Sequence, residues 1–192
     1  MERIANAQRT EATRAALIGA ARRLFAEKGY AATSTPEIVA EARVTRGALY
    51  HHYADKSDLF VAVARQAAEE VAYEIDRRSR GETTPLGALV KGAEAYFAAM
   101  AEGGRARLLL IDAPAILRPA QVLELSDIAG AQELLDGLRA ALGRRKEVPI
   151  EELAMLLSAA FDRAALAIAK GESPARYRAA IRFLLGELAR ES

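Results

Sequence analysis

Two short helical patterns separated by three residues constrain the fold of this chain more than any other feature of its sequence. Thr35 is expected to cap the first short helix and Pro36 to occupy its first position, where a missing N–H breaks no hydrogen bond. This helix is expected to end near Ala42. Thr45 can cap a second helix over residues 46–53. Two short helices joined by so brief a connection are typical of a helix-turn-helix.

Longer helical patterns lie on both sides of this pair. Apolar residues recur every three or four positions from about Thr10 to Lys28, and again from Asp55 to about Gly81. The abundance of Ala, Leu, Glu and Arg also favours helix throughout the chain. The sequence therefore predicts an all-α protein of about nine helices. Pro114 is expected to end a helix at 105–113, and Gly130 is expected to end a helix at 119–129. The other remaining helices are expected at 85–102, 131–144, 150–170 and 174–190.

Composition and charge exclude several classes of protein. Cysteine is absent, which removes disulfides, thiolate metal sites and cysteine nucleophiles. The N-terminal residues lack the apolar core of a signal peptide and no segment is long and apolar enough to span a bilayer, so we expect a cytoplasmic protein with no membrane partner. The net charge is only +1, but residues 1–56 carry nine Lys and Arg against six Asp and Glu. The positive charge thus lies in the part of the chain that holds the short helices.

The second short helix has one apolar side, formed by Leu49 and Tyr53. The opposite side must face solvent and is expected to carry Arg46, Gly47, Tyr50 and His51. Arginine can pair with guanine, tyrosine and histidine can reach a phosphate or a thymine methyl group, and glycine allows a close approach of the backbone. We therefore predict that this side enters the major groove of DNA.

Phosphate contacts are expected beside this helix. The hydroxyl and N–H groups of Thr33, Ser34 and Thr35 precede the first short helix, where anions bind favourably. Lys56 begins the next long helix and adds a positive charge. These four residues are predicted to hold the DNA backbone.

The chain from about Arg14 to Val63 resembles the DNA-binding region of the TetR family of bacterial transcriptional regulators. The pieces that carry the resemblance are LFAEKGY, ATS, TRGALYHHY and DKSDLF. It implies an all-helical homodimer with a DNA-binding domain over residues 1–60 and an effector-binding and dimerisation bundle over residues 61–192. It also implies double-stranded operator DNA as a partner. By position in the motif, the resemblance implies DNA contacts from Thr35, Thr45, Arg46, Gly47, Tyr50, His51 and Lys56.

One residue departs from the family pattern. Arg43 stands in the turn where the family usually has glycine. If the backbone is left-handed there, a residue with a side chain costs about 1 kcal/mol. Arg43 can add a phosphate contact, so we include it in the predicted DNA-binding set.

The last two helices, 150–170 and 174–190, carry apolar residues on more than one side. One chain cannot easily cover all of them, which favours a two-fold four-helix interface in a homodimer. The alternative is that the helices before them bury these residues within one chain.

A mostly apolar pocket is expected inside the bundle. Its predicted lining is Tyr96, Phe97, Met100, Leu109 and Phe161, although these side chains are also of the kind that simply packs a core. Asp112 ends one apolar run, and Asp162 with Arg163 interrupts another, so these charged residues must face solvent, pair with each other or meet a ligand. This lining favours a hydrophobic or amphipathic small-molecule effector.

These features together predict a transcriptional repressor that a small molecule releases from its operator. The sequence has no glycine-rich phosphate loop, nucleophile elbow or metal-ligand spacing, so no catalytic residue, cofactor or metal is predicted. His51 and His52 are adjacent and point about 100° apart on a helix, which does not suit a shared metal ion. Two alternatives remain open: a helical protein-interaction adaptor that uses the same N-terminal helices, and an activator whose DNA binding the ligand promotes.

Overall fold

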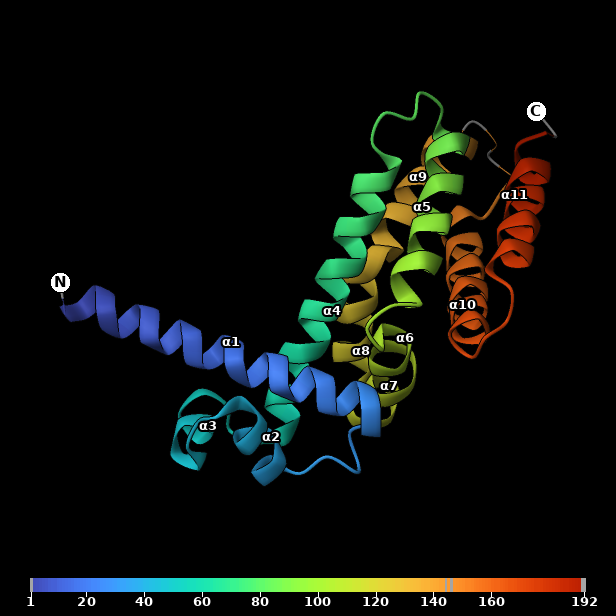
Figure 1. Cartoon of the computed structure of the whole chain (residues 1–192). Helices are drawn as coiled ribbons and strands as arrows, with labels where there is room; N and C mark the ends of the chain where they lie inside the picture. The colour runs from blue at the N-terminus through green and yellow to red at the C-terminus, as the bar shows by residue number, and fades with distance from the viewer. Residues whose placement is uncertain (1, 144, 146, 191–192) are drawn as a thin grey trace.

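The computed structural model describes residues 2–143, 145 and 147–190, and all regular structure in these residues is helical. The long helix α1 (Glu2–Lys28) lies across the small helices α2 (Thr35–Ala42) and α3 (Arg46–His52), and α4 (Lys56–Ser79) leads from this group into a larger bundle (Figure 1). The predicted all-α fold is confirmed.

Side-chain caps set the boundaries of the short helices. The hydroxyl of Thr45 accepts a hydrogen bond from the N–H of Ala48 at 3.2 Å and begins α3, as predicted. Asp55 caps α4 in the same way, accepting from the N–H of Asp58 at 2.8 Å. Each cap satisfies one N–H that the helix cannot bond internally, which contributes about 1 kcal/mol.

The predicted cap of α2 was wrong by one residue. Ser34, not Thr35, is the N-cap, because its hydroxyl accepts from the N–H of Glu37 while the Glu37 carboxylate accepts from the N–H of Ser34 at 2.9 Å. This reciprocal pair is a capping box. Thr35 therefore lies inside the first turn, ahead of Pro36.

The predicted start of α1 near Thr10 was also wrong, since the helix begins at Glu2. Residues 2–9 contain neither proline nor glycine, so nothing in them stops the helix even though they carry no regular apolar face. The N-terminal half of α1 projects away from the other helices (Figure 1).

One continuous core joins α1 to α4. Fully buried residues from each helix meet in it, and three aromatic rings, of Phe25, Tyr30 and Phe60, pack with centroids 5.2 to 5.6 Å apart. Burial of one such side chain stabilises the fold by about 1.5 to 3 kcal/mol. The core residues that fix the short helices are Leu17, Phe25, Ile38, Leu49, Phe60 and Val63.

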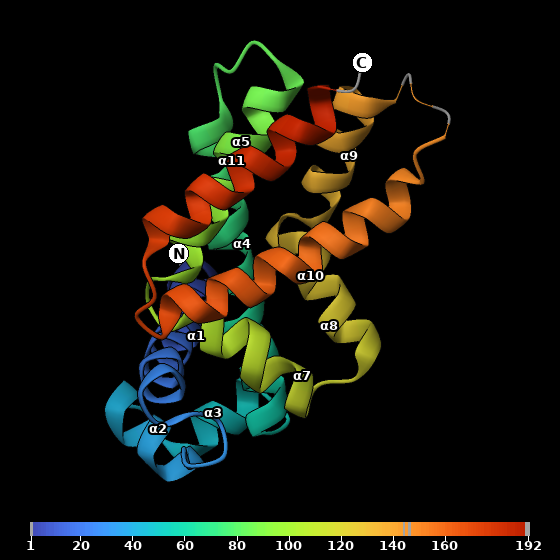
Figure 2. The ribbon, with the colours of Figure 1, turned by 90° about the vertical axis from the view of Figure 1, so that its right-hand side faces the viewer.

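The bundle contains the rest of the described chain. Its elements are α5 (Pro85–Met100), α6 (Arg105–Arg107), the π-helical segment η1 (Leu108–Asp112), α7 (Ala113–Ile116), α8 (Pro119–Ser126), the π-helical segment η2 (Asp127–Ala131), α9 (Gln132–Leu142), α10 (Ile150–Ala169) and α11 (Pro174–Arg190). Helices α4, α5 and α9 pack together, while α10 and α11 pack on α5 and form an outer layer (Figure 2). None of the helices described is sufficiently long and apolar to cross a membrane.

The predicted end of a helix at Pro114 was wrong. The chain continues through η1 into α7, and the N–H of Ala113 bonds the carbonyl of Leu108, five residues earlier. In a regular α-helix the ring of a proline clashes with the carbonyl four residues before it. The wider π turn just before Pro114 changes this spacing, so the helix passes the proline.

The predicted break at Gly130 is confirmed. Gly130 has a φ of 119°, and a Cβ at this position would lie 2.7 Å from the Cδ1 atom of Ile75. Only glycine adopts this backbone readily, and only glycine leaves room for α4. The kink turns α9 relative to α8 and so shapes the space inside the bundle.

Candidate nucleic-acid interface and bundle cavity

Helix α3 turns one side to the core and the other to solvent. Leu49 and Tyr53, the residue that ends the helix, are buried. The four residues predicted to face outward, Arg46, Gly47, Tyr50 and His51, are all exposed, Tyr50 by 43%. The structure therefore gives α3 the orientation that a groove-reading helix requires.

Tyr50 joins α2 and α3 into one polar surface. The guanidinium of Arg46 lies 5.5 Å from the centre of the Tyr50 ring. The Thr35 hydroxyl, and after it the Arg46 guanidinium, hydrogen-bond the phenol and hold the pKa of Tyr50 below its usual range. Thr35 at the start of α2 is therefore adjacent to the exposed side of α3, as its predicted role requires.

The turn between the two short helices is left-handed at Arg43. This residue has φ 55° and ψ 41°, and it is the only residue other than glycine with a positive φ in the described part of the chain. Its N–H bonds the carbonyl of Ala40 at 3.1 Å and closes the end of α2. The condition considered for this turn is therefore met, and the Arg43 side chain is exposed beside α3.

Arg43 and Arg46 differ from Arg23 and Lys28 of α1 in having no acidic partner among the described residues. Arg23 and Lys28 of α1 are each paired with a glutamate of α2, at 2.7 and 2.8 Å. Within residues 2–143, 145 and 147–190, no carboxylate lies within ion-pair distance of Arg43 or Arg46. These two charges are therefore free to meet a phosphate or a base.

The predicted phosphate contact from Thr33 was wrong. Thr33 is 1% exposed, its hydroxyl donates to the carbonyl of Gly29 at 2.8 Å, and its N–H donates to the carbonyl of Tyr30. Ser34 is exposed, but both its hydroxyl and its N–H donate to the Glu37 carboxylate at 2.9 Å. A phosphate contact from Ser34 would have to displace that carboxylate.

Lys56 holds the loop that precedes α2. Its ammonium group donates to the carbonyls of Tyr30 and Thr33 at 3.0 and 2.9 Å and lies 4.0 Å from the centre of the Tyr30 ring. Two of its three donors are therefore used within the chain. The structure gives Lys56 a positioning role, and its predicted contact with a phosphate depends on the third donor.

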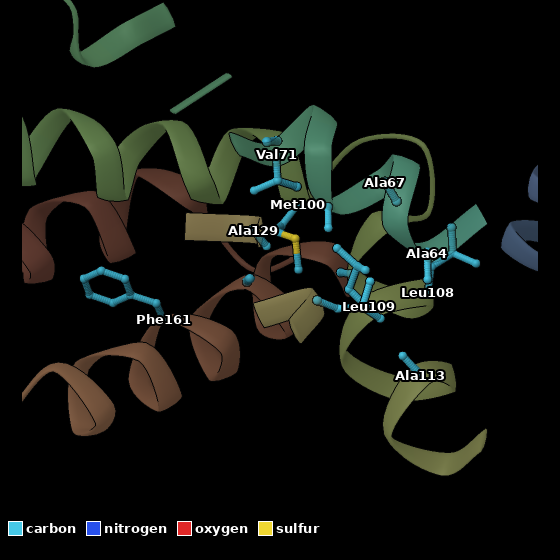
Figure 3. Packing of buried hydrophobic residues seen from close by; sticks show 14 of the residues in the cluster. Ala64, Ala67, Val71, Met100, Leu108, Leu109, Ala113, Ala129 and Phe161 are labelled. Carbon is cyan, nitrogen blue, oxygen red and sulfur yellow. The ribbon is translucent and has the colours of Figure 1, made fainter. Parts of the chain in front are cut away.

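The bundle surrounds a partly open cavity of about 250 Å³ between α5, α10 and the segment from η1 to α9. Most of its wall is apolar. Five of the seven residues predicted for a pocket line it: Tyr96, Met100, Leu109, Phe161 and Asp162. Met100 and Leu109 lie together near α4, and Phe161 stands apart from them on α10 (Figure 3).

The other two predicted pocket residues, Phe97 and Asp112, do not line the cavity. Phe97 is buried behind it, with its ring centre 5.7 Å from that of Phe161. Asp112 turns toward Arg107, whose Nε atom lies 3.6 Å from the Asp112 carboxylate. The structure therefore gives Phe97 a role in packing and Asp112 an ion pair within the chain, and it brings neither to the cavity.

A second part of the cavity wall was not predicted. It comes from α8, η2 and α9, which the sequence shows only as interrupted helix. The apolar residues at 122, 125 and 129 do follow helical spacing, and this signal could have placed them on one side. The unpredicted lining residues of this wall are Val122, Leu125, Ser126, Ala129, Gly130, Ala131, Glu133 and Leu134.

One polar pair stands at the cavity. The hydroxyl of Tyr96 donates to the Oδ1 atom of Asp162 at 2.5 Å. Burial raises the pKa of Asp162, and the hydrogen bond from Tyr96 opposes this rise. Burial also raises the pKa of Tyr96, with the adjacent Asp162 adding to the effect, so the tyrosine keeps its proton.

A groove of about 620 Å³ adjoins the cavity between α8, α9 and α10. Four residues line both spaces, namely Ser126, Ala131, Ser158 and Asp162. Asp162 therefore lies at the boundary between the interior of the bundle and its surface.

Comparison with known families decides the identity of this architecture. The family described as "Bacterial regulatory proteins, tetR family" matches residues 17–63, and the "Tetracyclin repressor-like, C-terminal domain" matches residues 86–191. The chain belongs to the TetR family. The predicted family is thereby confirmed.

Individual relatives agree with this assignment. The TetR-family chain is 34% identical over 88 residues to the transcriptional regulator HbdR of Aromatoleum sp. strain CIB, covering 46% of this chain and 38% of that one. It is 36% identical over 83 residues to the transcriptional regulator AcrR of Shigella flexneri, covering 43% and 39%. The alignments thus span about two fifths of the length of these curated relatives.

Solved structures match over most of the chain. A TetR-family transcriptional regulator of Pectobacterium atrosepticum is 30% identical, with a TM-score of 0.67 and coverage of 96% of this chain and 95% of that one. The regulator FadR of Bacillus subtilis, solved with stearoyl-CoA, has a TM-score of 0.77 at 14% identity, covering 88% and 96%. The FadR match shows a shared fold.

Proposed function

We propose that this TetR-family protein is a DNA-binding transcriptional repressor that acts as a homodimer in the bacterial cytoplasm and leaves its operator when a small apolar or amphipathic ligand fills the cavity. The observation that carries the proposal is the exposed set Arg46, Gly47, Tyr50 and His51 on α3. The buried Leu49 on the opposite side fixes this set outward.

The exposed residues of this surface fall into two groups, according to whether they can reach the bases or the phosphates of the DNA. Arg46, with Gly47, Tyr50 and His51, faces base edges, and Arg46 suits a guanine because its guanidinium can donate two parallel hydrogen bonds. Thr35, Arg43 and Thr45 flank this set and suit phosphates, which position the helix without reading sequence. Lys56 supports both groups indirectly by holding the loop before α2.

The outer helices supply the dimer interface in this proposal. Leu156 of α10 and Phe183 of α11 are each 70% exposed, and Met155 and Leu184 beside them are exposed as well. The two helices that carry these residues lie on the outside of the bundle (Figure 2). A two-fold interface there would bury this face and hold two copies of α3 about 34 Å apart, the spacing of one turn of DNA.

Helix α4 offers one route for coupling ligand to DNA. It begins at Lys56 beside α3, and Ile75 near its other end lines the cavity. A ligand that moves the far end of α4 would move the near end too, because the helix is a rigid element of 24 residues.

The segment from α6 to η1 offers a second route. Leu109 and Leu110 line the cavity, while Arg107 donates to the carbonyls of Glu27 and Lys28, the last two residues of α1, at 3.4 and 3.2 Å. Two residues earlier, Arg105 binds Glu70 of α4 at 2.8 Å. The cavity wall and the DNA-binding helices are therefore joined through the arginines of one short segment.

Glu70 is the point at which this segment, α1 and α4 meet. Its carboxylate accepts from Arg22 of α1 at 2.6 Å and from Arg105 at 2.8 Å. These hydrogen bonds, first from Arg22 and then from Arg105, hold the pKa of Glu70 below its usual range against the effect of burial. Glu70 therefore stays ionised and keeps the three elements together.

The first test is to sequence the genomic DNA fragments that the purified protein retains and to measure its affinity for the enriched site at several salt concentrations. A repressor should enrich a palindrome, and log affinity should fall with log salt at a slope of about −0.9 for each phosphate contacted. A protein-interaction adaptor would enrich no sequence and show no such slope.

The coupling has its own test. If a ligand weakens operator binding by some factor, operator DNA must weaken ligand binding by the same factor. A ligand that strengthens operator binding would indicate the activator alternative. A tight ligand of the cavity that leaves operator affinity unchanged would contradict the coupling.

A further inference from the structure

The charge of the cavity narrows the chemistry of its ligand. Besides its apolar wall, the cavity is lined by two carboxylates, Asp162 and Glu133. The adjoining groove adds Asp127, Glu151 and Glu152, of which Glu151 is paired with Arg139 outside the groove. Among the described residues that line either space, none is Lys, Arg or His.

Asp162 has an unused acceptor at the boundary of the two spaces. Its Oδ1 atom accepts from Tyr96, and its other oxygen forms no hydrogen bond or ion pair with any described residue. No basic side chain contributes to the electrostatics of Asp162, whose pKa reflects only burial and the hydrogen bond from Tyr96. A partly buried carboxylate without a cation is unfavourable, and a ligand that brings one relieves it.

The size and lining of the cavity indicate the size of the apolar part of the ligand and the charge of its head group. At about 30 Å³ per water-sized group, 250 Å³ holds roughly eight such groups, which is a short alkyl chain or a small ring system. The rings of Tyr96 and Phe161 line the cavity next to Asp162, and aromatic faces attract cations. An anionic head group at this position would meet carboxylates and no cation.

We propose that the effector of this protein is a cationic amphiphile, with an apolar part of about eight carbon atoms in the cavity and an ammonium-type head group on the Asp162 carboxylate. This inference rests on the proposed function for the biological role of the ligand. The binding chemistry itself follows from the cavity.

The test compares three probes that share an eight-carbon chain and differ in head group: octylammonium, octanol and octanoate. Isothermal titration calorimetry of each into the full chain at pH 7 should show octylammonium binding at least about tenfold more tightly than octanol, with octanoate the weakest. The variant Asp162→Asn should lose about ten- to hundredfold in octylammonium affinity and change octanol affinity little.

Asp162→Asn should fold, because the asparagine carbonyl can still accept from Tyr96, and circular dichroism melting checks this. The matched control is Glu69→Gln, which removes one exposed carboxylate of α4 that does not line the cavity or the groove. A second variant, Tyr96→Phe, keeps the Asp162 charge and removes its donor, so octylammonium should bind it at least as well as the native chain.

The outcomes separate the two proposals. Octanol or octanoate binding as tightly as octylammonium, no octylammonium binding, or unchanged octylammonium affinity in Asp162→Asn would each overturn the cationic ligand, whether or not the protein binds an operator. Octylammonium that binds through Asp162 without changing operator affinity would support the ligand class and contradict release from the operator.

Discussion

The DNA-binding helices and the bundle of this protein are built in different ways. In the first region, α2, α3 and α4 each begin at a side-chain cap, and a closed core holds their inner faces. In the second, two π-helical segments and a kink at Gly130 interrupt the helices around an open cavity. Local hydrogen bonds thus fix the shape of the surface that is proposed to fit a DNA groove, while irregular packing leaves space where a ligand is proposed to bind.

The largest effect is expected from the outer face of the bundle. The double variant Leu156→Glu, Phe183→Glu places charges in the proposed interface and should leave a folded monomer. Operator affinity should fall by at least about a hundredfold, since one recognition helix then binds alone. Sedimentation velocity and gel shift measure the two effects.

The control for this variant is Tyr73→Glu. Tyr73 is 62% exposed on α4 and lies outside the proposed interface, so its substitution should change neither mass nor affinity. A double variant that stays dimeric would show that the dimer uses another face and would contradict the proposed interface.

The next effect tests the DNA-binding region alone. Arg46→Ala should cost about 1 to 3 kcal/mol of operator binding and relax the preference at one base pair, because Arg46 is proposed to read a base. Binding to a panel of single-base operator variants measures the preference. An equal loss on every sequence would instead make Arg46 a phosphate contact. Arg80→Ala, at the far end of α4, is the matched control.

The ion pairs of Glu70 with Arg22 and Arg105, which connect the two regions, predict a pH-dependent stability. The pKa of Glu70 is lowered in the folded chain from its ordinary value of 4.5, so its stabilisation is present above that pH and is lost as the pH falls through the lower, folded value. Glu70→Gln should therefore lower the free energy of unfolding by about 1 to 2 kcal/mol at pH 6. The difference should shrink below pH 4.5.

Urea denaturation at pH 6 and at pH 3 to 4 measures this difference, and Glu69→Gln serves as its control. If the free energy of unfolding differed between Glu70→Gln and the native chain by the same amount at both pH values, the ion pairs of Glu70 would not be what stabilises the contact between the two regions.

The smallest effect is expected from Arg43, in the turn between α2 and α3. Arg43→Gly relieves a left-handed backbone and should raise the free energy of unfolding by about 0.5 to 1 kcal/mol. The same change should reduce the slope of operator affinity against salt by about one, because one phosphate contact is lost. A stability gain with an unchanged slope would remove Arg43 from the DNA-binding set and leave its conformational role intact.

Local chemistry made the DNA-binding region largely predictable. Thr45 and Asp55 cap their helices as predicted because a cap depends on residues within a few positions. The error at α2 arose between two adjacent hydroxyl residues, and Glu37, three positions after Ser34, was the signal for the correct one. The burial of Thr33 depends on how its loop folds onto α1, and no neighbouring residue reveals it.

The bundle was less predictable because distant residues decide its details. Pro114 is a helix breaker by local rules, yet η1 lets the helix continue. A ligand was one of the alternatives left open for Asp112, which faces Arg107 across the same wide turn. The wall formed by α8 and α9 depends on the fit of Gly130 against Ile75, a contact between positions far apart in the chain.

The wide turn at residues 108–112 makes chain length itself a structural quantity in this segment. A π turn closes with five residues where an α turn closes with four, so the extra residue is taken up within one turn and the helix on either side of η1 keeps its direction. Deleting one residue there would restore the regular α-helical spacing and bring the ring of Pro114 against the carbonyl of the preceding turn. A single-codon deletion in η1 would therefore act on this segment as a proline placed inside a regular helix does.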